Sequence, residues 1–167
     1  YFVGGDGSLA SVLENYTFLT GRQELPPYWA LGYLTSRYGY HSADEAADVI
    51  AKIKAVGLPL DALVFDLYWQ GAAPDGMGNL NWYAPNFPEP TKMLADFAAQ
   101  DVKTICITEP FFTSKTANYE SLQQAGFFAD NSVSNMGWLG ADNVGLIDAT
   151  NPEAMDWMWQ FYKARTA

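Results

Sequence analysis

An apolar run at residues 60–69, bounded by Gly57 and Pro59 before it and by Gly71 after it, limits the possible folds of this chain more than any other stretch. A run of this length between such residues is typical of a strand covered on both faces, as in a parallel sheet between helices. Asp66 lies where such a strand should end, and ligands bind at the carboxyl ends of strands in sheets of this kind. We therefore expect Asp66 to face a binding site.

Two further strands are predicted, one on each side of this run in the sequence. Residues 28–34 form an apolar stretch after a Pro-Pro pair and predict a first buried strand that ends near residues 36–38. Residues 102–108 predict a third strand, which the following Glu-Pro pair ends.

Helix signals separate and follow these strands. Ser42 and Glu45 have the spacing of a capping box, Pro90 opens a second helical pattern, and Asn151 precedes a third. Strands that alternate with helices predict an α/β fold with a parallel sheet, either doubly wound or a (β/α)8 barrel. No Gly-x-Gly-x-x-Gly motif follows the first strand, which weakens the dinucleotide-binding alternative. A barrel needs ~250 residues, so about three strand-helix units would be only its first part.

Two remaining stretches have weaker patterns. Residues 1–5 resemble the end of a strand, and a helix is expected to run through residues 9–19. Residues 111–150 are too long for a plain connection between packed elements, so we expect an elaborated loop with one short helix near residues 119–124.

The charge balance favours a neutral ligand. Nineteen acidic and nine basic residues give a net charge of -10, which argues against nucleic acid or anionic lipid as partner. No apolar run approaches the ~20 residues of a membrane span. Aromatic residues make up 16% of the chain, which fits either a large aromatic core or a site that stacks on flat neutral ligands such as sugars.

Metal and cofactor chemistry has little support in the sequence. The chain has one histidine, His41, and one cysteine, Cys106, which cannot build the usual nitrogen and sulfur ligand sets. Cys106 lies inside an apolar run and is expected to be a buried small hydrophobe. We expect no cofactor, and the sequence leaves the compartment open, an extracellular or periplasmic one included.

Polar and aromatic residues follow the predicted strands. Arg37 and Tyr38 come after the first strand, Asp66 and Trp69 after the second, and Glu109 after the third. Asp66 and Glu109 on neighbouring strands predict a two-carboxylate glycosidase site, with one general acid and one nucleophile or base. The alternative is that each carboxylate pairs with Arg37 or with backbone N–H groups.

Short motifs spread along the chain resemble glycoside hydrolase family 31, the α-glucosidase and α-xylosidase family. They occur in the family's order and roughly at its spacing. The matching stretches are residues 19–22 (Leu-Thr-Gly-Arg), 25–32 (Leu-Pro-Pro-Tyr-Trp-Ala-Leu-Gly), 36–38 (Ser-Arg-Tyr), 58–61 (Leu-Pro-Leu-Asp), 87–90 (Phe-Pro-Glu-Pro) and 148–152 (Asp-Ala-Thr-Asn-Pro).

This resemblance implies a retaining, exo-acting α-glycosidase that cleaves terminal α-glucosyl or α-xylosyl units on a (β/α)8 TIM barrel. Residues 1–27 would be a lead-in strand and helix joined to a preceding β-sandwich domain, and residues 28–167 the N-terminal part of the barrel. The implied nucleophile and acid/base both lie beyond Ala167. The fragment alone is therefore expected to be inactive. Its uncovered strands are expected to associate with the rest of the parent chain or with another copy of the fragment.

The resemblance also implies roles for residues within the chain. Asp66 matches the family's aspartate that hydrogen-bonds hydroxyls of the terminal sugar. Leu67 and Ile107 match apolar residues that line the sugar pocket, and Tyr38 and Trp138 match aromatic ones. The implied partner is an α-linked oligosaccharide or glycoside.

Two departures from the family pattern affect these expectations. Tyr68 stands where many members have a second acidic residue, and a Gly- and Asn-rich loop follows it, which is expected to reshape the subsite for the rest of the substrate. Ala149 replaces an aromatic residue, which should affect packing. The alternative function is a sugar-binding or structural half-barrel without catalysis.

Overall fold

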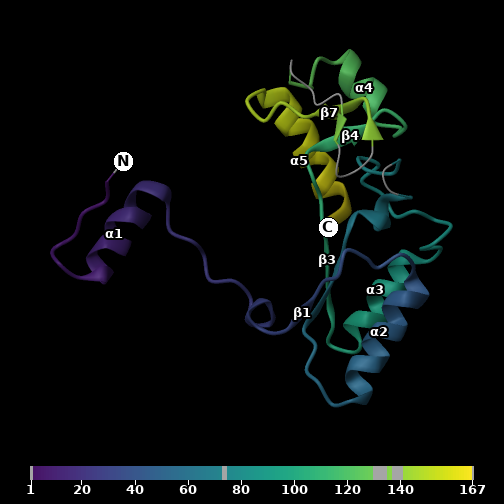
Figure 1. Ribbon diagram of the computed structural model, residues 1–167, viewed down its shortest axis with the longest axis horizontal. Coiled ribbons are helices and arrows are strands. Elements are labelled where there is room, and N and C mark those ends of the chain that lie inside the picture. The colour runs from purple at the N-terminus through teal and green to yellow at the C-terminus, as the bar shows by residue number, and fades with distance from the viewer. Residues whose placement is uncertain (1, 73–74, 130–134, 137–140, 167) are drawn as a thin grey trace.

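The computed structural model describes residues 2–72, 75–129, 135–136 and 141–166, and a parallel sheet lies at its centre (Figure 1). The sheet order is β1 (Leu34–Thr35), β2 (Ala62–Phe65) and β3 (Lys103–Cys106). Helix α2 (Ala43–Ala55) connects the first two strands, and α3 (Pro90–Ala98) connects the last two. The predicted α/β class with a parallel sheet is confirmed, as the first part of a barrel.

The core is built around β2, the central strand. Phe65 is fully buried and meets the rings of Tyr40, Trp82 and Phe87 edge-on, with centroids 5.2 to 6.2 Å apart. Burying a large apolar side chain contributes about 1.5–3 kcal/mol, and edge-to-face ring pairs add to it. This cluster attaches both connecting helices to the sheet through Ile50, Met93 and Phe97.

The ends of α2 follow local sequence signals. Ser42 Oγ accepts a hydrogen bond from the backbone N–H of Glu45 at 3.1 Å, which confirms the predicted cap. At the other end Gly57 adopts a φ of +74°, and the N–H of Leu58 donates to the carbonyl of Ile53. This is a Schellman closure, in which glycine takes the left-handed conformation at no steric cost.

The N-terminal region differs from the sequence-based expectation. Helix α1 (Leu9–Thr20) forms as predicted and is capped by Ser8, but none of its residues is buried and it stands apart from the sheet in Figure 1. Residues 2–5 pair with no strand in the described part of the chain, so the expected strand end does not form there.

The predicted first strand at residues 28–34 is wrong over most of its length. Tyr28–Leu31 form a short 3-10 helix, η1, and only the last residue of the run enters β1. Tyr28 is 92% exposed and Leu31 72% exposed. In the described part of the chain no element covers these side chains and no strand pairs with their backbone, although the apolar pattern predicted both. The ladder begins where Leu34 pairs with Ala62.

The run around Asp66 also contains a short helix. The strand ends at Phe65, as predicted, and Leu67–Gln70 form a 3-10 turn, η2, with Asp66 at its N-cap. The rest of the apolar run does not continue the strand, because the Asp66 side chain accepts from the first free N–H and starts the turn.

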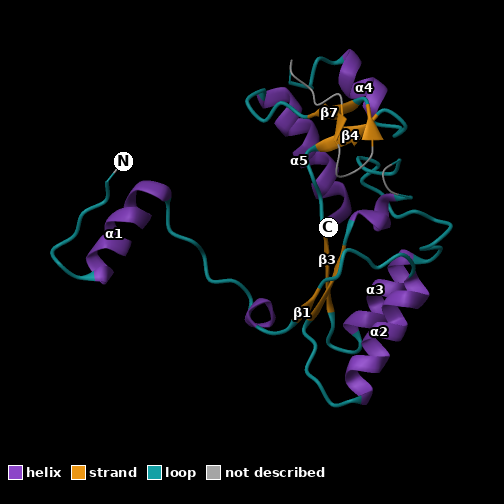
Figure 2. Ribbon diagram, viewed as in Figure 1, coloured by secondary structure: helices purple, strands orange, loops and turns teal. Residues whose placement is uncertain are grey.

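The stretch after β3 is more ordered than predicted. Its short helix α4 (Tyr119–Gln124) is confirmed, but β4 (Phe111–Thr113) pairs antiparallel with β7 (Val144–Leu146). A second short pair joins β5 (Asn135–Met136) to β6 (Ala141–Asp142). Figure 2 shows the β4–β7 pair stacked against α5 (Pro152–Thr166), the predicted last helix.

Asn151 Oδ1 caps α5 by accepting from the N–H of Glu153 at 2.9 Å. In the part of the chain that the structure describes, no helix has the length and apolar character needed to cross a membrane.

Candidate functional site

Asp66 lies directly after the central strand, at the carboxyl end of the sheet. Its N–H donates to the carbonyl of Gly39 at 2.5 Å, which attaches it to the segment that follows β1. Its Oδ1 accepts from the N–H of Leu67 at 2.7 Å, and the side chain is half-buried. Within the described residues Oδ2 has no hydrogen-bond partner, so one carboxylate oxygen is left to accept a donor from a ligand.

Tyr38 is placed beside Asp66 by a left-handed backbone conformation, with a φ of +56°. A non-glycine residue rarely adopts this region outside turns and functional sites. Its ring meets that of Tyr68 edge-on, with centroids 5.8 Å apart. Loss of hydration, followed by the influence of Tyr68 and the negative charge of Asp66, raises the pKa of Tyr38 above its ordinary value.

Glu109 follows the third strand and completes this group. Burial raises the pKa of its carboxyl, and the negative charge of Asp66 raises it further. We call Tyr38, Asp66, Tyr68 and Glu109 the strand-end cluster. Two carboxyls and two phenols can accept and donate hydrogen bonds to a ligand rich in hydroxyl groups.

Arg37 does not pair with either carboxylate of this cluster. Its Nη2 lies 2.9 Å from Glu45 Oε1, and the other oxygen of Glu45 accepts from both the backbone N–H and Nδ1 of His41. The hydrogen bond from the His41 N–H is the main reason why the pKa of Glu45 lies below its usual value. The alternative that Arg37 pairs with Asp66 or Glu109 is therefore wrong. The alternative of a backbone partner holds for Asp66, which accepts from the N–H of Leu67.

The other predicted site residues lie beneath or beside the cluster. Leu67 is 2% exposed and packs with Met77 and Val144. Trp69 is 7% exposed and its indole N–H donates to the carbonyl of the half-buried Ile107 at 2.9 Å. Trp138 lies outside the described residues. Contact of any of these residues with a sugar stays a prediction.

Two members of the neighbourhood were given no site role from the sequence. The sequence marks Tyr68 only as a departure from the family pattern, and His41 only as a single histidine that cannot build a metal site. The His41 and Tyr68 rings lie 3.9 Å apart between centroids. Both follow a strand end within a few residues, which is the signal that could have found them.

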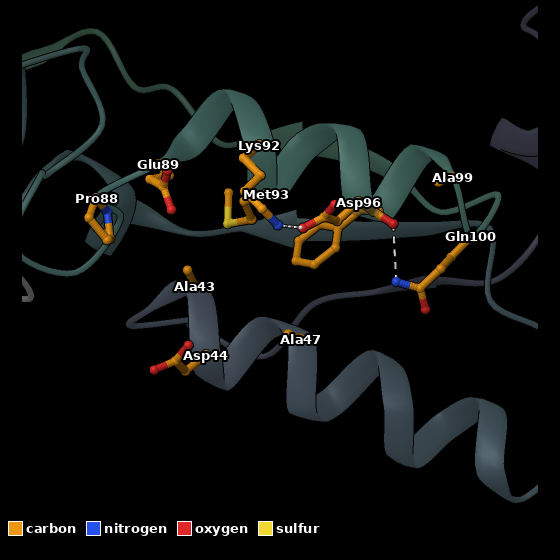
Figure 3. A pocket seen from close by; sticks show the side chains of 11 residues that line it. Ala43, Asp44, Ala47, Pro88, Glu89, Lys92, Met93, Asp96, Ala99 and Gln100 are labelled. Atoms are coloured by element: carbon orange, nitrogen blue, oxygen red, sulfur yellow. Dashed lines mark hydrogen bonds and ion pairs between the residues drawn. The ribbon is translucent and has the colours of Figure 1, made fainter.

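A separate groove of about 550 Å³ runs between α2 and α3, on the helix side of the sheet. Figure 3 shows Ala43 and Ala47 on one helix facing Met93 on the other, with the Lys92–Asp96 ion pair above them. No member of the strand-end cluster lines this groove. Among the described residues there is also no group of three or more histidine, cysteine or acidic side chains that could hold a metal ion.

Known proteins are similar to this chain in sequence. The model of the glycosyl hydrolases family 31 TIM-barrel domain matches residues 23–166. An alpha-glucosidase of Saccharolobus solfataricus is 33% identical over 101 residues, which cover 60% of this chain and 14% of that protein. The glucosidase 2 subunit alpha of Schizosaccharomyces pombe is 30% identical over 172 residues, which cover 97% of this chain and 17% of that protein.

Solved structures give the same result. The alpha-xylosidase of Xanthomonas citri superposes with a TM-score of 0.82 at 26% identity, and the match covers 96% of this chain and 18% of that one. The chain thus spans between 14% and 18% of the length of these three proteins.

Proposed function

Because the chain belongs to glycoside hydrolase family 31, through the TIM-barrel domain of that family, we propose that the protein carrying it hydrolyses terminal α-glucosyl or α-xylosyl units. The observation that carries this proposal is the strand-end cluster, in which Asp66 keeps one carboxylate oxygen without a partner among the described residues. The net charge of -10 also suits a neutral glycoside better than an anionic ligand.

In the proposed mechanism Asp66 orients the sugar. Its Oδ2 accepts a hydrogen bond from a hydroxyl of the terminal unit, while the rings of Tyr38 and Tyr68 border the sugar and limit water. A charged hydrogen bond of this kind contributes about 1.5–3 kcal/mol. Glu109, with its raised pKa, stays protonated to a higher pH than an ordinary glutamic acid and can donate as well as accept.

The bond-breaking groups are proposed to lie outside residues 1–167, as the resemblance implies. In a retaining reaction one carboxylate attacks the anomeric carbon while a carboxylic acid protonates the departing oxygen. Water, deprotonated by the same acid/base, then releases the sugar from the covalent intermediate. The residues of this chain bind and orient the substrate for both steps.

The test is Asp66→Asn in the full-length protein, assayed on aryl α-glucoside and aryl α-xyloside. The amide keeps the shape of the carboxylate but removes its charge, so kcat/KM should fall roughly ten- to a hundredfold. Asp48→Asn, on an exposed helix face where Asp48 pairs with Lys52, is the matched control and should leave the rates unchanged. Wild-type kinetics in the Asp66 variant would exclude the proposed role.

A further inference from the structure

A second hollow, of about 450 Å³, lies between the loop after η2, the start of α4 and α5. We propose that this hollow, the asparagine cleft, binds a neutral glucan chain at a site separate from the strand-end cluster. The residues on which the proposal depends are Asn81, Trp82, Tyr83 and Asn118. None of them belongs to the strand-end cluster.

The chemistry of the lining selects for neutral hydroxyl-rich ligands. All ten residues around the asparagine cleft are uncharged, although the chain as a whole carries a net charge of -10. Side-chain amides offer a donor and an acceptor in one plane, and aromatic rings offer a flat apolar surface. That combination suits a pyranose, which has hydroxyls at its rim and C–H groups on its faces, and gives no counter-charge to an ionic ligand.

Several polar groups of the cleft are unused by the protein. Asn81 is exposed, and within the described residues its amide makes no hydrogen bond. In the same part of the chain the Tyr83 hydroxyl and the Trp82 indole N–H also have no hydrogen-bond partner. Tyr83 is 37% exposed. A ligand in the cleft could therefore bond to these groups without breaking any hydrogen bond within the protein.

Contacts within the protein hold two lining residues of the cleft in place. The Trp82 ring packs against Phe65, Trp69 and Phe87 at centroid distances of 5.1 to 5.4 Å. Asn118 Nδ2 donates to the carbonyl of Gly78 at 2.8 Å, which leaves its amide oxygen as an acceptor. A wall that is already ordered loses little conformational entropy when a ligand binds.

The test is electrophoresis of the full-length protein through native gels that contain soluble starch, dextran or polygalacturonate. The wild type should be retarded by at least one neutral glucan and not by the anionic polymer. Asn81→Ala and Tyr83→Ala should each reduce the retardation at least threefold, while kcat/KM on an aryl α-glycoside and the Tm stay close to wild type. Tyr28→Ala, at an aromatic residue that is 92% exposed elsewhere, is the matched control and should be retarded like wild type.

Asp66→Asn separates this inference from the proposed function. That variant should show the roughly ten- to a hundredfold fall in kcat/KM and keep full retardation. A loss of retardation in it would locate glucan binding at the strand-end cluster and overturn the inference. Absence of retardation of the wild type by either glucan, or full retardation of both cleft variants, would also overturn it. If Asp66→Asn keeps full activity while the cleft variants lose retardation, glucan binding at the asparagine cleft is supported and the proposed role of Asp66 is wrong.

Discussion

The pKa values of Glu45, in the first turn of α2, and Glu109, after β3, are shifted in opposite directions because their neighbours differ. Glu45 accepts hydrogen bonds from His41 and faces the guanidinium of Arg37, so its carboxylate is favoured and its pKa is lowered. Glu109 loses hydration and lies near the negative Asp66, so its protonated form is favoured and its pKa is raised. Glu45 therefore stabilises the fold above the pKa it has in the unfolded chain, and Glu109 below it.

Replacing Glu109 by glutamine should alter how stability depends on pH. The folded pKa of Glu109 lies above its unfolded value, so its favourable contribution is complete below the unfolded pKa and is lost as pH rises through the folded pKa. The Glu109→Gln variant carries no charge beside Asp66, and its Tm relative to wild type should be higher at pH 7 than at pH 4. Thermal unfolding at both pH values measures this, and a pH-independent difference would contradict it.

The same variant separates substrate binding from bond breaking. Glu109→Gln should retain turnover of an aryl α-glucoside at saturating substrate, since the bond-breaking carboxylates are proposed to lie elsewhere. Loss of all turnover would instead place Glu109 in the chemistry and restore the pair of Asp66 and Glu109 that the sequence alone suggested.

Elements whose signals are local could be predicted from the sequence, and elements that depend on distant partners could not. Ser42 and Asn151 lie within three residues of the N–H groups that they cap, so α2 and α5 were found. The strand at Phe111–Thr113 was missed because its partner is Val144–Leu146, far along the chain. The sequence predicts a strand at Tyr28–Leu31, where the structure has a 3-10 helix, because an apolar run does not reveal whether another element covers it.

In the candidate site, too, some features could be predicted from the sequence and others could not. Asp66 and Glu109 could be assigned to one face because the ends of parallel strands meet there. The pairing of Arg37 with Glu45 could not, since it depends on the rotamer of a long side chain and on where α2 begins. The asparagine cleft could not be predicted either, because it joins a loop to α4 and α5.

Gln70 connects the loop after η2 to the rest of the structure, and we expect this side chain to be essential for the order of that loop. This side chain is 2% exposed, and its Oε1 accepts from the N–H groups of Gly78 and Leu80 at 3.1 and 3.0 Å. Gln70→Ala leaves both buried donors without an acceptor, at a cost of about 1–3 kcal/mol for each. Hydrogen–deuterium exchange in the full-length protein should become at least tenfold faster at residues 75–82.

A matched control for this experiment is Gln100→Ala. Gln100 is exposed, and its Nε2 donates to the carbonyl of Asp96 on α3. Exchange at residues 75–82 should be unchanged in that variant. Equal exchange in the Gln70 variant and the wild type would mean that other contacts hold the loop.

The molecule as a whole presents surfaces that it does not cover by itself. In the described part of the chain β1 and β3 each have one edge without a partner. Large apolar side chains are also exposed on α1 and η1, among them Leu9 at 89% and Phe18 at 81%. Unpaired strand edges and exposed apolar groups promote association between chains.

The 167-residue chain, expressed alone, should therefore self-associate and hydrolyse no α-glucoside. Self-association follows from the open edges, and inactivity from the proposal that the nucleophile and acid/base lie elsewhere. Sedimentation velocity at several concentrations, with an aryl α-glucoside assay on each fraction, measures both. A stable monomer whose activity disappears in Asp66→Ala and Glu109→Ala would overturn the fragment interpretation.

The hydrogen bond from Asn118 to Gly78 has a consequence for synthesis on the ribosome. The two residues are 40 positions apart, so Gly78 leaves the ribosome well before Asn118 does. At about 5–20 residues per second, this delay is roughly 2–8 seconds. Phe112, which packs against Gly78, also appears late in that interval. The nascent loop therefore spends seconds without its contacts to Asn118 and Phe112, and this is the interval in which a chaperone would find it accessible.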